Sequence, residues 1–217
     1  LVIAVCILQF LLGNPSNFMN NDPNNHPLNM LGTIYKGGII VPIIQTLLLT
    51  VLALSIERYF ALRSAFGKGS LSKFVANIKD ALAAGDMKKA QEICDKQRGS
   101  VANVVTSTLR KYEEMEKNTA LPKEQKLLAI QKELEEATAL EMPMMQQNLP
   151  IIATITTLGT LMGLLGTVIG MIRSFAALSA GGGADSMALS QGISEALINT
   201  AFGILTGALA VISYNYY

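Results

Sequence analysis

The 217-residue sequence has no tryptophan, one histidine and two cysteines, and only 15% of its residues are charged. Cys6 lies in an apolar run and Cys94 in a charged region, so no disulfide framework or zinc site is indicated. His26 lies in a polar stretch without neighbouring metal ligands, and we interpret it as a solvated loop residue. A net charge of +1 does not favour nucleic-acid binding. Without a nucleophile elbow, a phosphate loop or paired metal ligands in the sequence, we expect neither an enzyme nor a cofactor.

Apolar residues are abundant instead, and the few charges are unevenly distributed. Half of the residues are hydrophobic. Of 33 Asp, Glu, Lys and Arg residues, 28 lie between residues 57 and 147, and residues 37–56, 150–172 and 196–217 contain none. This pattern is typical of membrane spans around one large polar domain.

Three uncharged segments are long enough to cross a bilayer. Twenty residues rising about 1.5 Å each give about 30 Å, the thickness of the hydrocarbon core. We therefore predict transmembrane helices at residues 37–56, 148–173 and 191–217. Residues 1–12 are apolar but reach only about 18 Å, which fits a partial amino-terminal transmembrane helix. A signal peptide is the alternative, although no basic segment precedes this run and no small-residue cleavage site follows it.

Basic residues near the predicted spans set the orientation. Those that follow the span at 37–56 are Arg58, Arg63, Lys68 and Lys73. The opposite side has only Lys36 and Arg173 near span ends, so we expect residues 57–147 to form a cytoplasmic domain. Residues 13–36 and 174–190, the latter with Gly181–Gly183, then form loops on the other side of the membrane.

The cytoplasmic domain is predicted to be helical throughout, which gives an all-α fold. Phe74, Ile78 and Leu82 recur at helical spacing, and a break at Gly85 precedes further helical segments at 88–97, 100–116 and 124–141. The last segment has one apolar face, which we interpret as a packing face in a helical bundle rather than a membrane-surface helix. That face contains Leu127, Ile130, Leu134, Ala137 and Leu140.

Small and polar residues follow one face of the helix at 148–173. At 100° per residue they fall within about 80° of one another. They are Thr156, Thr160, Gly163, Thr167, Gly170 and Ser174. Gly159 with Gly163, and Gly166 with Gly170, are spaced for close helix packing. The threonines either face a polar path or bond back to carbonyls of their own helix.

The helix at 191–217 has a longer polar stripe, also about 80° wide, which is formed by Gln191, Glu195, Asn199, Thr206 and Ser213. Glu195 is the only ionisable residue inside a complete span, and no Lys or Arg of the spans is expected to neutralise it. It is either a protonated structural residue or a group that exchanges protons with an aqueous path. Thr200 lies about 140° from Glu195 around the helix and should face different neighbours.

Two motifs in these helices carry a family resemblance. Residues 163–171, Gly-Leu-Leu-Gly-Thr-Val-Ile-Gly-Met, and 192–203, Gly-Ile-Ser-Glu-Ala-Leu-Ile-Asn-Thr-Ala-Phe-Gly, resemble the paired signatures of the ExbB/TolQ/MotA family. Residues 213–215, Ser-Tyr-Asn, resemble the end of the family's last span. The resemblance covers residues 37–217, and the motifs are more similar to those of ExbB and TolQ than to those of the flagellar stator subunit MotA. The amino-terminal apolar segment departs from the usual three-span ExbB, and residues 207–210 lack the proline usual there.

The resemblance implies a homopentamer in a lipid membrane, whose helices 148–173 and 191–217 line a pore holding two ExbD-like single-span subunits. Each partner would carry one Asp that takes up and releases protons, and the motor would work on a TonB-like protein to drive nutrient uptake. The implied pore residues are Thr160, Thr167, Glu195, Asn199 and Thr200. The implied helix-packing residues are Gly159, Gly163, Gly166, Gly170 and Gly203.

Two alternatives stay open. Within the family, the chain could be a TolQ-like or stator subunit that serves envelope maintenance or motility. From another class, it could be a non-transporting membrane scaffold whose polar stripes only pack. The identity of a single-span partner separates these hypotheses.

Overall fold

A computed structural model describes residues 1–23, 25–180 and 186–217. Within these ranges the chain is helical and has no strand, apart from an isolated bridge between Phe18 and Pro27. Three helical stretches there are long and apolar enough to cross a membrane, at Gly38–Ala65, Lys123–Ser179 and Leu189–Tyr216. The all-α membrane fold predicted from the sequence is therefore confirmed.

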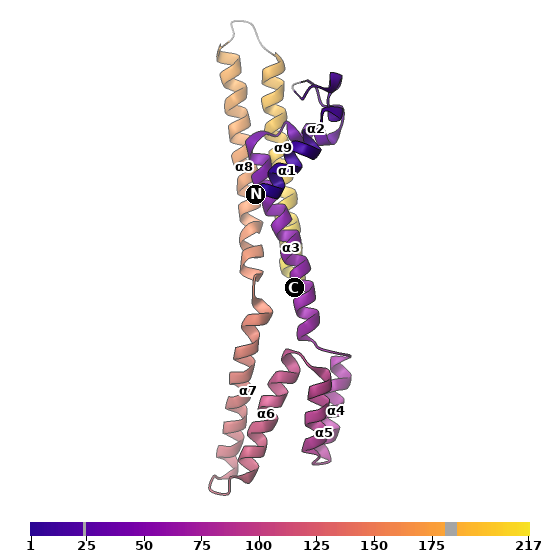
Figure 1. Cartoon of the computed structure of the whole chain (residues 1–217). Helices are drawn as coiled ribbons and strands as arrows, with labels where there is room; N and C mark the ends of the chain where they lie inside the picture. Colours follow the sequence, from indigo (N-terminus) through magenta and orange to yellow (C-terminus); the bar gives the residue numbers. More distant parts are fainter. Residues whose placement is uncertain (24, 181–185) are drawn as a thin grey trace. The chain divides into compact units, whose positions relative to one another are not determined.

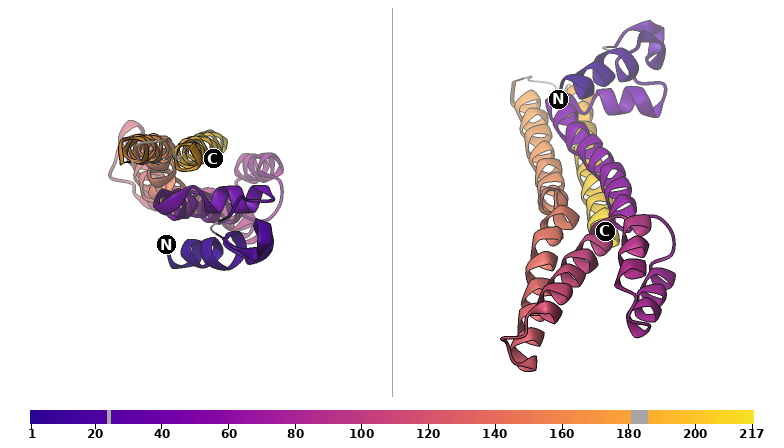
Figure 2. Two further views of the ribbon diagram at one scale, coloured as in Figure 1. Left: turned by 90° about the horizontal axis from the view of Figure 1, so that it is seen from above. Right: turned by 60° about the horizontal axis from the view of Figure 1, so that its bottom comes forward.

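The chain divides into two compact units. The first contains Leu1–Ile56 and Asn148–Tyr217, and the second contains Glu57–Gln147. The first unit is built on three long helices, α3 (Val41–Ala65, which continues into the second unit), α8 (Leu149–Ala180) and α9 (Ser186–Tyr216). Helices α8 and α9 lie side by side and run in opposite directions (Figures 1 and 2). Val51 of α3 packs with Ile152 and Ile155 of α8 and Ala210 of α9 in a buried cluster.

Helices α8 and α9 are both longer than the sequence predicted, at the two ends that the predicted loop connects. The predicted loop at 174–190 is helical as far as Ala180 and again from Ser186. The segment 175–178 contains no glycine or proline, which accounts for the extra turns of α8. Gly181–Gly183 lie outside the described residues.

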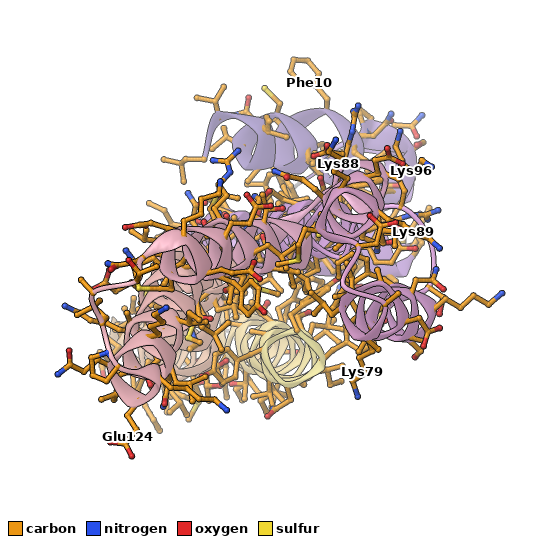
Figure 3. The ribbon with its side chains drawn as sticks, turned by 90° about the horizontal axis from the view of Figure 1, so that it is seen from below. Phe10, Lys79, Lys88, Lys89, Lys96 and Glu124 are labelled. Atoms are coloured by element: carbon orange, nitrogen blue, oxygen red, sulfur yellow. The ribbon has the colours of Figure 1, made fainter. Side chains whose placement is uncertain are left out.

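The amino-terminal segment of the first unit is short helices joined by an asparagine-rich turn. Helix α1 (Val2–Cys6) continues as a π-helical stretch (Ile7–Leu12), and α2 (Met30–Tyr35) follows the turn. Asn17 ends the first stretch by donating to the carbonyls of Leu11 and Leu12, at 2.9 and 3.0 Å. Phe18 is fully buried and meets Tyr35 edge to face. The side chain of Phe10, by contrast, projects outward (Figure 3).

The second unit is the end of α3 followed by four helices, α4 (Leu71–Ala83), α5 (Met87–Gln97), α6 (Ser100–Lys117) and α7 (Lys123–Gln146). Its core contains Phe74, Ile78, Ala90, Cys94 and Leu109. Most charged side chains face outward, as Lys79, Lys88, Lys89 and Lys96 do in Figure 3, whereas Arg58 is buried. This amphipathic pattern explains why four charged helices fold around one small apolar core.

Turns between these helices depend on a few specific residues. The Asp86 side chain caps α5 by accepting from the Lys89 amide, at 3.0 Å. Gly67 has a φ of +76°, and a Cβ there would collide with the Arg98 carbonyl, so only glycine fits. Between α7 and α8, Asn148 has a φ of +67°, and this left-handed residue separates the two helices.

The apolar face predicted for residues 124–141 is less covered than expected. Ala137 is buried, but Leu127, Leu134 and Leu140 are exposed. Leu82, which recurs at helical spacing with the buried Phe74 and Ile78, is exposed as well. The spacing of apolar residues thus predicted the apolar face of α7 correctly, but α6 covers only part of that face.

Burial of the Cys94 thiol leads to a test of this core. Burial raises the pKa of Cys94, and the Thr106 side chain offsets part of that effect. Because the thiolate is the reactive form, iodoacetamide should alkylate Cys94 at pH 8 at least about tenfold more slowly in the folded protein than in the denatured chain. Mass spectrometry of a Cys6→Ala variant measures both rates. Equal rates would contradict the buried position of Cys94.

Candidate functional site

The site is built on glycines that bring α8 and α9 into backbone contact. A Cβ on Gly203 would lie 2.6 Å from the Cα of Gly163, and one on Gly170 would lie 2.7 Å from the Gly192 carbonyl oxygen. Gly159 faces Thr206 in the same way, with a Cβ position 3.1 Å from its methyl group. Small residues at these positions permit the close approach that membrane helices use in place of hydrophobic burial. The glycines predicted to pack therefore lie at the contact between the two helices.

Two of the predicted pore threonines meet across this contact. The hydroxyls of Thr167 on α8 and Thr200 on α9 are in direct contact. The Thr167 hydroxyl also lies within hydrogen-bond distance of the carbonyl oxygens of Gly163 (3.2 Å) and Ala196 (3.4 Å). The Thr200 hydroxyl donates to the Ala196 carbonyl at 3.0 Å. Both residues are half-buried. The pair forms one hydrogen-bonding centre that belongs to both helices.

The other threonines bond within their own helix. Thr160 is exposed and donates to the Thr156 carbonyl, and Thr156 donates to Ile152, both at 3.3 Å. Thr206 is buried and donates to Phe202 at 2.8 Å. Back-bonding, one of the two interpretations that the sequence left open, is therefore present at these threonines. Back-bonding to the helix satisfies all of them, and only Thr167 and Thr200 also bond to each other.

Glu195 and Asn199 lie together, away from the hydroxyl pair. The Asn199 side chain is fully buried beside Gly166 and donates from Nδ2 to the Gly37 carbonyl at 2.8 Å. Glu195 is 5% exposed, and its Oε1 lies against Gly38. Because Thr200 lies about 140° around α9 from Glu195, the two groups face different sides of the helix.

Glu195 has a basic partner that the sequence prediction excluded. Arg173 of α8 donates from Nη1 to Glu195 Oε1 at 2.7 Å, and the two side chains form an ion pair. The expectation that no Lys or Arg of the spans neutralises Glu195 is therefore wrong. Periodicity within each helix gives no register between helices, and Arg173 was interpreted only as a residue at the end of a span.

The register could have been found from the glycines. If Gly163 and Gly203 are opposed in an antiparallel pair, moving four residues along α8 reaches Thr167, and moving three residues back along α9 reaches Thr200. Ten residues along α8 reach Arg173, and eight back along α9 reach Glu195. Equal steps from this contact place Thr167 opposite Asn199 and Arg173 opposite Ile193, so one glycine contact would have predicted both pairs to within one or two residues.

Comparison with known proteins identifies the family to which this site belongs. Residues 97–217, more than half of the chain, match the MotA/TolQ/ExbB proton channel family. A biopolymer transport protein of Synechocystis sp. named ExbB-like 1 is 31% identical over 198 residues, which cover 85% of this chain and 69% of that relative. The chain belongs to the MotA/TolQ/ExbB proton channel family.

Other relatives carry both family names. The ExbB-like 3 protein of Synechocystis sp. is 37% identical over 84 residues, which cover 38% of this chain and 40% of that relative. The Tol-Pal system protein TolQ of Pseudomonas aeruginosa is 24% identical over 185 residues, which cover 80% of this chain and 77% of that relative. The family match includes all of α8 and α9, so the glycine contact, the hydroxyl pair and the ion pair lie in the family region.

The glycine contact gives a direct prediction for stability. A Gly203→Ala substitution places a methyl group against the Gly163 backbone and should destabilise the α8–α9 pair by about 1–3 kcal/mol. Thermal unfolding in detergent measures the loss. Ala208→Val, which adds bulk at an exposed position of the same helix, is the matched control and should leave the midpoint unchanged. A Gly203→Ala midpoint equal to that of the unaltered protein would show that the two helices are further apart.

Proposed function

We propose that this chain is the pore-forming subunit of a bacterial inner-membrane motor that couples proton flow to mechanical work. Five copies would surround single-span ExbD-like subunits, with residues 57–147 on the cytoplasmic side, and the complex would act on a TonB-like protein to power nutrient uptake across the outer membrane. The activity proposed is ion passage and not enzymatic catalysis. The observation that supports it most is the contact between the Thr167 and Thr200 hydroxyls.

A hydroxyl pair suits transient contact with an acidic partner. Each hydroxyl has one proton to donate and two lone pairs that accept, so it can bond to a carboxylate or to its protonated form. Thr167 and Thr200 already satisfy helix carbonyls, and they remain half-buried rather than enclosed. With both protons engaged, the hydroxyl oxygens keep lone pairs that can accept from a partner's protonated carboxyl group, and they lose no bond of their own when that carboxyl gives its proton to water and leaves.

The energy scale is sufficient for mechanical work. One elementary charge that crosses about 100 mV releases about 2.3 kcal/mol. A few protons per step then offset several broken contacts between an inner subunit and the surrounding helices. Five outer subunits around two inner ones would never match in symmetry, so successive protonations would turn the inner pair.

A TolQ-like function is the second candidate, because a TolQ protein is similar to this chain over 80% of its length. Both functions use the same channel chemistry and differ in the partner that receives the work. The protein that co-purifies with the complex would separate them. A purified oligomer with no single-span partner would favour a non-transporting scaffold.

Removal of either hydroxyl tests the proposed centre. Thr200→Val and Thr167→Val keep the side-chain shape but remove the hydrogen-bonding group, and each should lower proton flux at least tenfold without loss of protein from the membrane. The measurement is dye-reported acidification of vesicles that contain the complex as purified from its own membrane, under an applied potential. Thr154→Val, also on α8 with its hydroxyl bonded to the Pro150 carbonyl, is the matched control. Undiminished flux in both variants would overturn the proposed centre.

A further inference from the structure

The start of α3 is held by side chains of α9. A short 3-10 turn at Gly38–Ile40 precedes α3, and the carbonyl of Gly37 just before it accepts from Asn199 Nδ2 at 2.8 Å. Gly38 has a φ of +77°, and a Cβ there would collide with the Glu195 carboxylate. Two successive backbone positions, Gly37 and Gly38, thus lie against two side chains one turn apart on α9.

Arg173 fixes the carboxylate in this arrangement. The Glu195 side chain is 7% exposed and that of Arg173 is 53% exposed, so the pair joins a buried acid to a half-exposed base. A charged group inside a membrane protein normally pairs with an opposite charge. Removing one member of such a pair leaves the other uncompensated. Arg173 comes from α8, so the pair ties α8, α9 and the start of α3 together.

We propose that Arg173 and Glu195 are positioning residues that fix the start of α3 against the α8–α9 pair. In this proposal Glu195 holds Arg173 and lies against Gly38 through the same oxygen, Oε1, and it is not the group that carries the transported ion. The carboxylate also faces a different side of α9 from Thr200, about 140° away. The ion pair thereby maintains the frame in which the hydroxyl pair is held.

Cross-linking measures this positioning without any transport assay. The methyl groups of Val41 and Ile198 both approach the same side of Gly37. In a Cys6→Ala, Cys94→Ala background, Val41→Cys and Ile198→Cys should therefore react together with a short homobifunctional thiol reagent. Arg173→Ala or Glu195→Ala should lower the yield several-fold, and Arg173→Lys should preserve most of it. Arg63→Ala, which removes a basic residue elsewhere on α3, is the matched control. Yields unaffected by both alanine variants would overturn the proposal.

A second variant separates positioning from ion transfer, and this part rests on the proposed function. Glu195→Gln keeps an oxygen that can accept from Arg173 but cannot take up or release a proton in the way a carboxylate does. We expect cross-linking near the unaltered level and proton flux within about threefold of it, which is less than 1 kcal/mol. Preserved cross-linking with a flux loss of tenfold or more would overturn the proposal and make Glu195 an ion-carrying group.

If Glu195→Gln does not keep α3 in place, a double variant in which the two charges are exchanged provides the test. Arg173→Glu combined with Glu195→Arg restores an ion pair but moves the carboxylate to α8. Recovery of both cross-linking and flux relative to the single substitutions supports positioning, and failure of either to recover overturns it. If the unaltered complex conducts no protons, the proposed function fails, and the cross-linking result still decides whether the pair positions α3.

Discussion

Backbone contact between α8 and α9 is the constraint on which the rest of the first unit depends. Gly163 and Gly203 lie so close that neither can carry a side chain without displacing the other helix. In a membrane, where apolar side chains gain little by leaving lipid, such contact provides dispersion energy and fixed register. Register then decides which polar residues meet, and here it brings Thr167 to Thr200 and Arg173 to Glu195.

Polar residues along this contact have distinct surroundings. Asn199 and Glu195 are buried against Gly37 and Gly38, whereas Thr167 and Thr200 are half-buried and in contact with each other. The polar stripe of α9 is therefore buried at Glu195 and Asn199 against the start of α3, and the hydroxyl pair, which lies outside that stripe, is half-buried. A channel wall must hold its shape while an acidic partner moves past it. The contacts of Glu195 and Asn199 with the start of α3 suit the first need, and the half-buried hydroxyl pair suits the second.

Sequence reasoning identified the helical membrane fold and the family, because charge segregation and two long motifs are properties of the chain itself. Gly159, Gly163, Gly166, Gly170 and Thr167 were also named from their spacing, and Thr200 and Gly203 from the family resemblance. Arg173 as the partner of Glu195, and Gly37 with Gly38 as neighbours of α9, were missed, since these contacts depend on how separate helices pack. Asn148 was missed for a related reason: a left-handed φ at an asparagine leaves little trace in apolar periodicity.

Native mass spectrometry of the complex extracted from its own membrane tests the central claim most directly. The claim is that this chain forms the wall of a channel around a different, single-span subunit. We expect five copies of the chain together with a single-span protein that carries an acidic residue in its membrane segment. A stable oligomer of this chain alone, with no such partner at any detergent concentration that preserves the assembly, would contradict the claim.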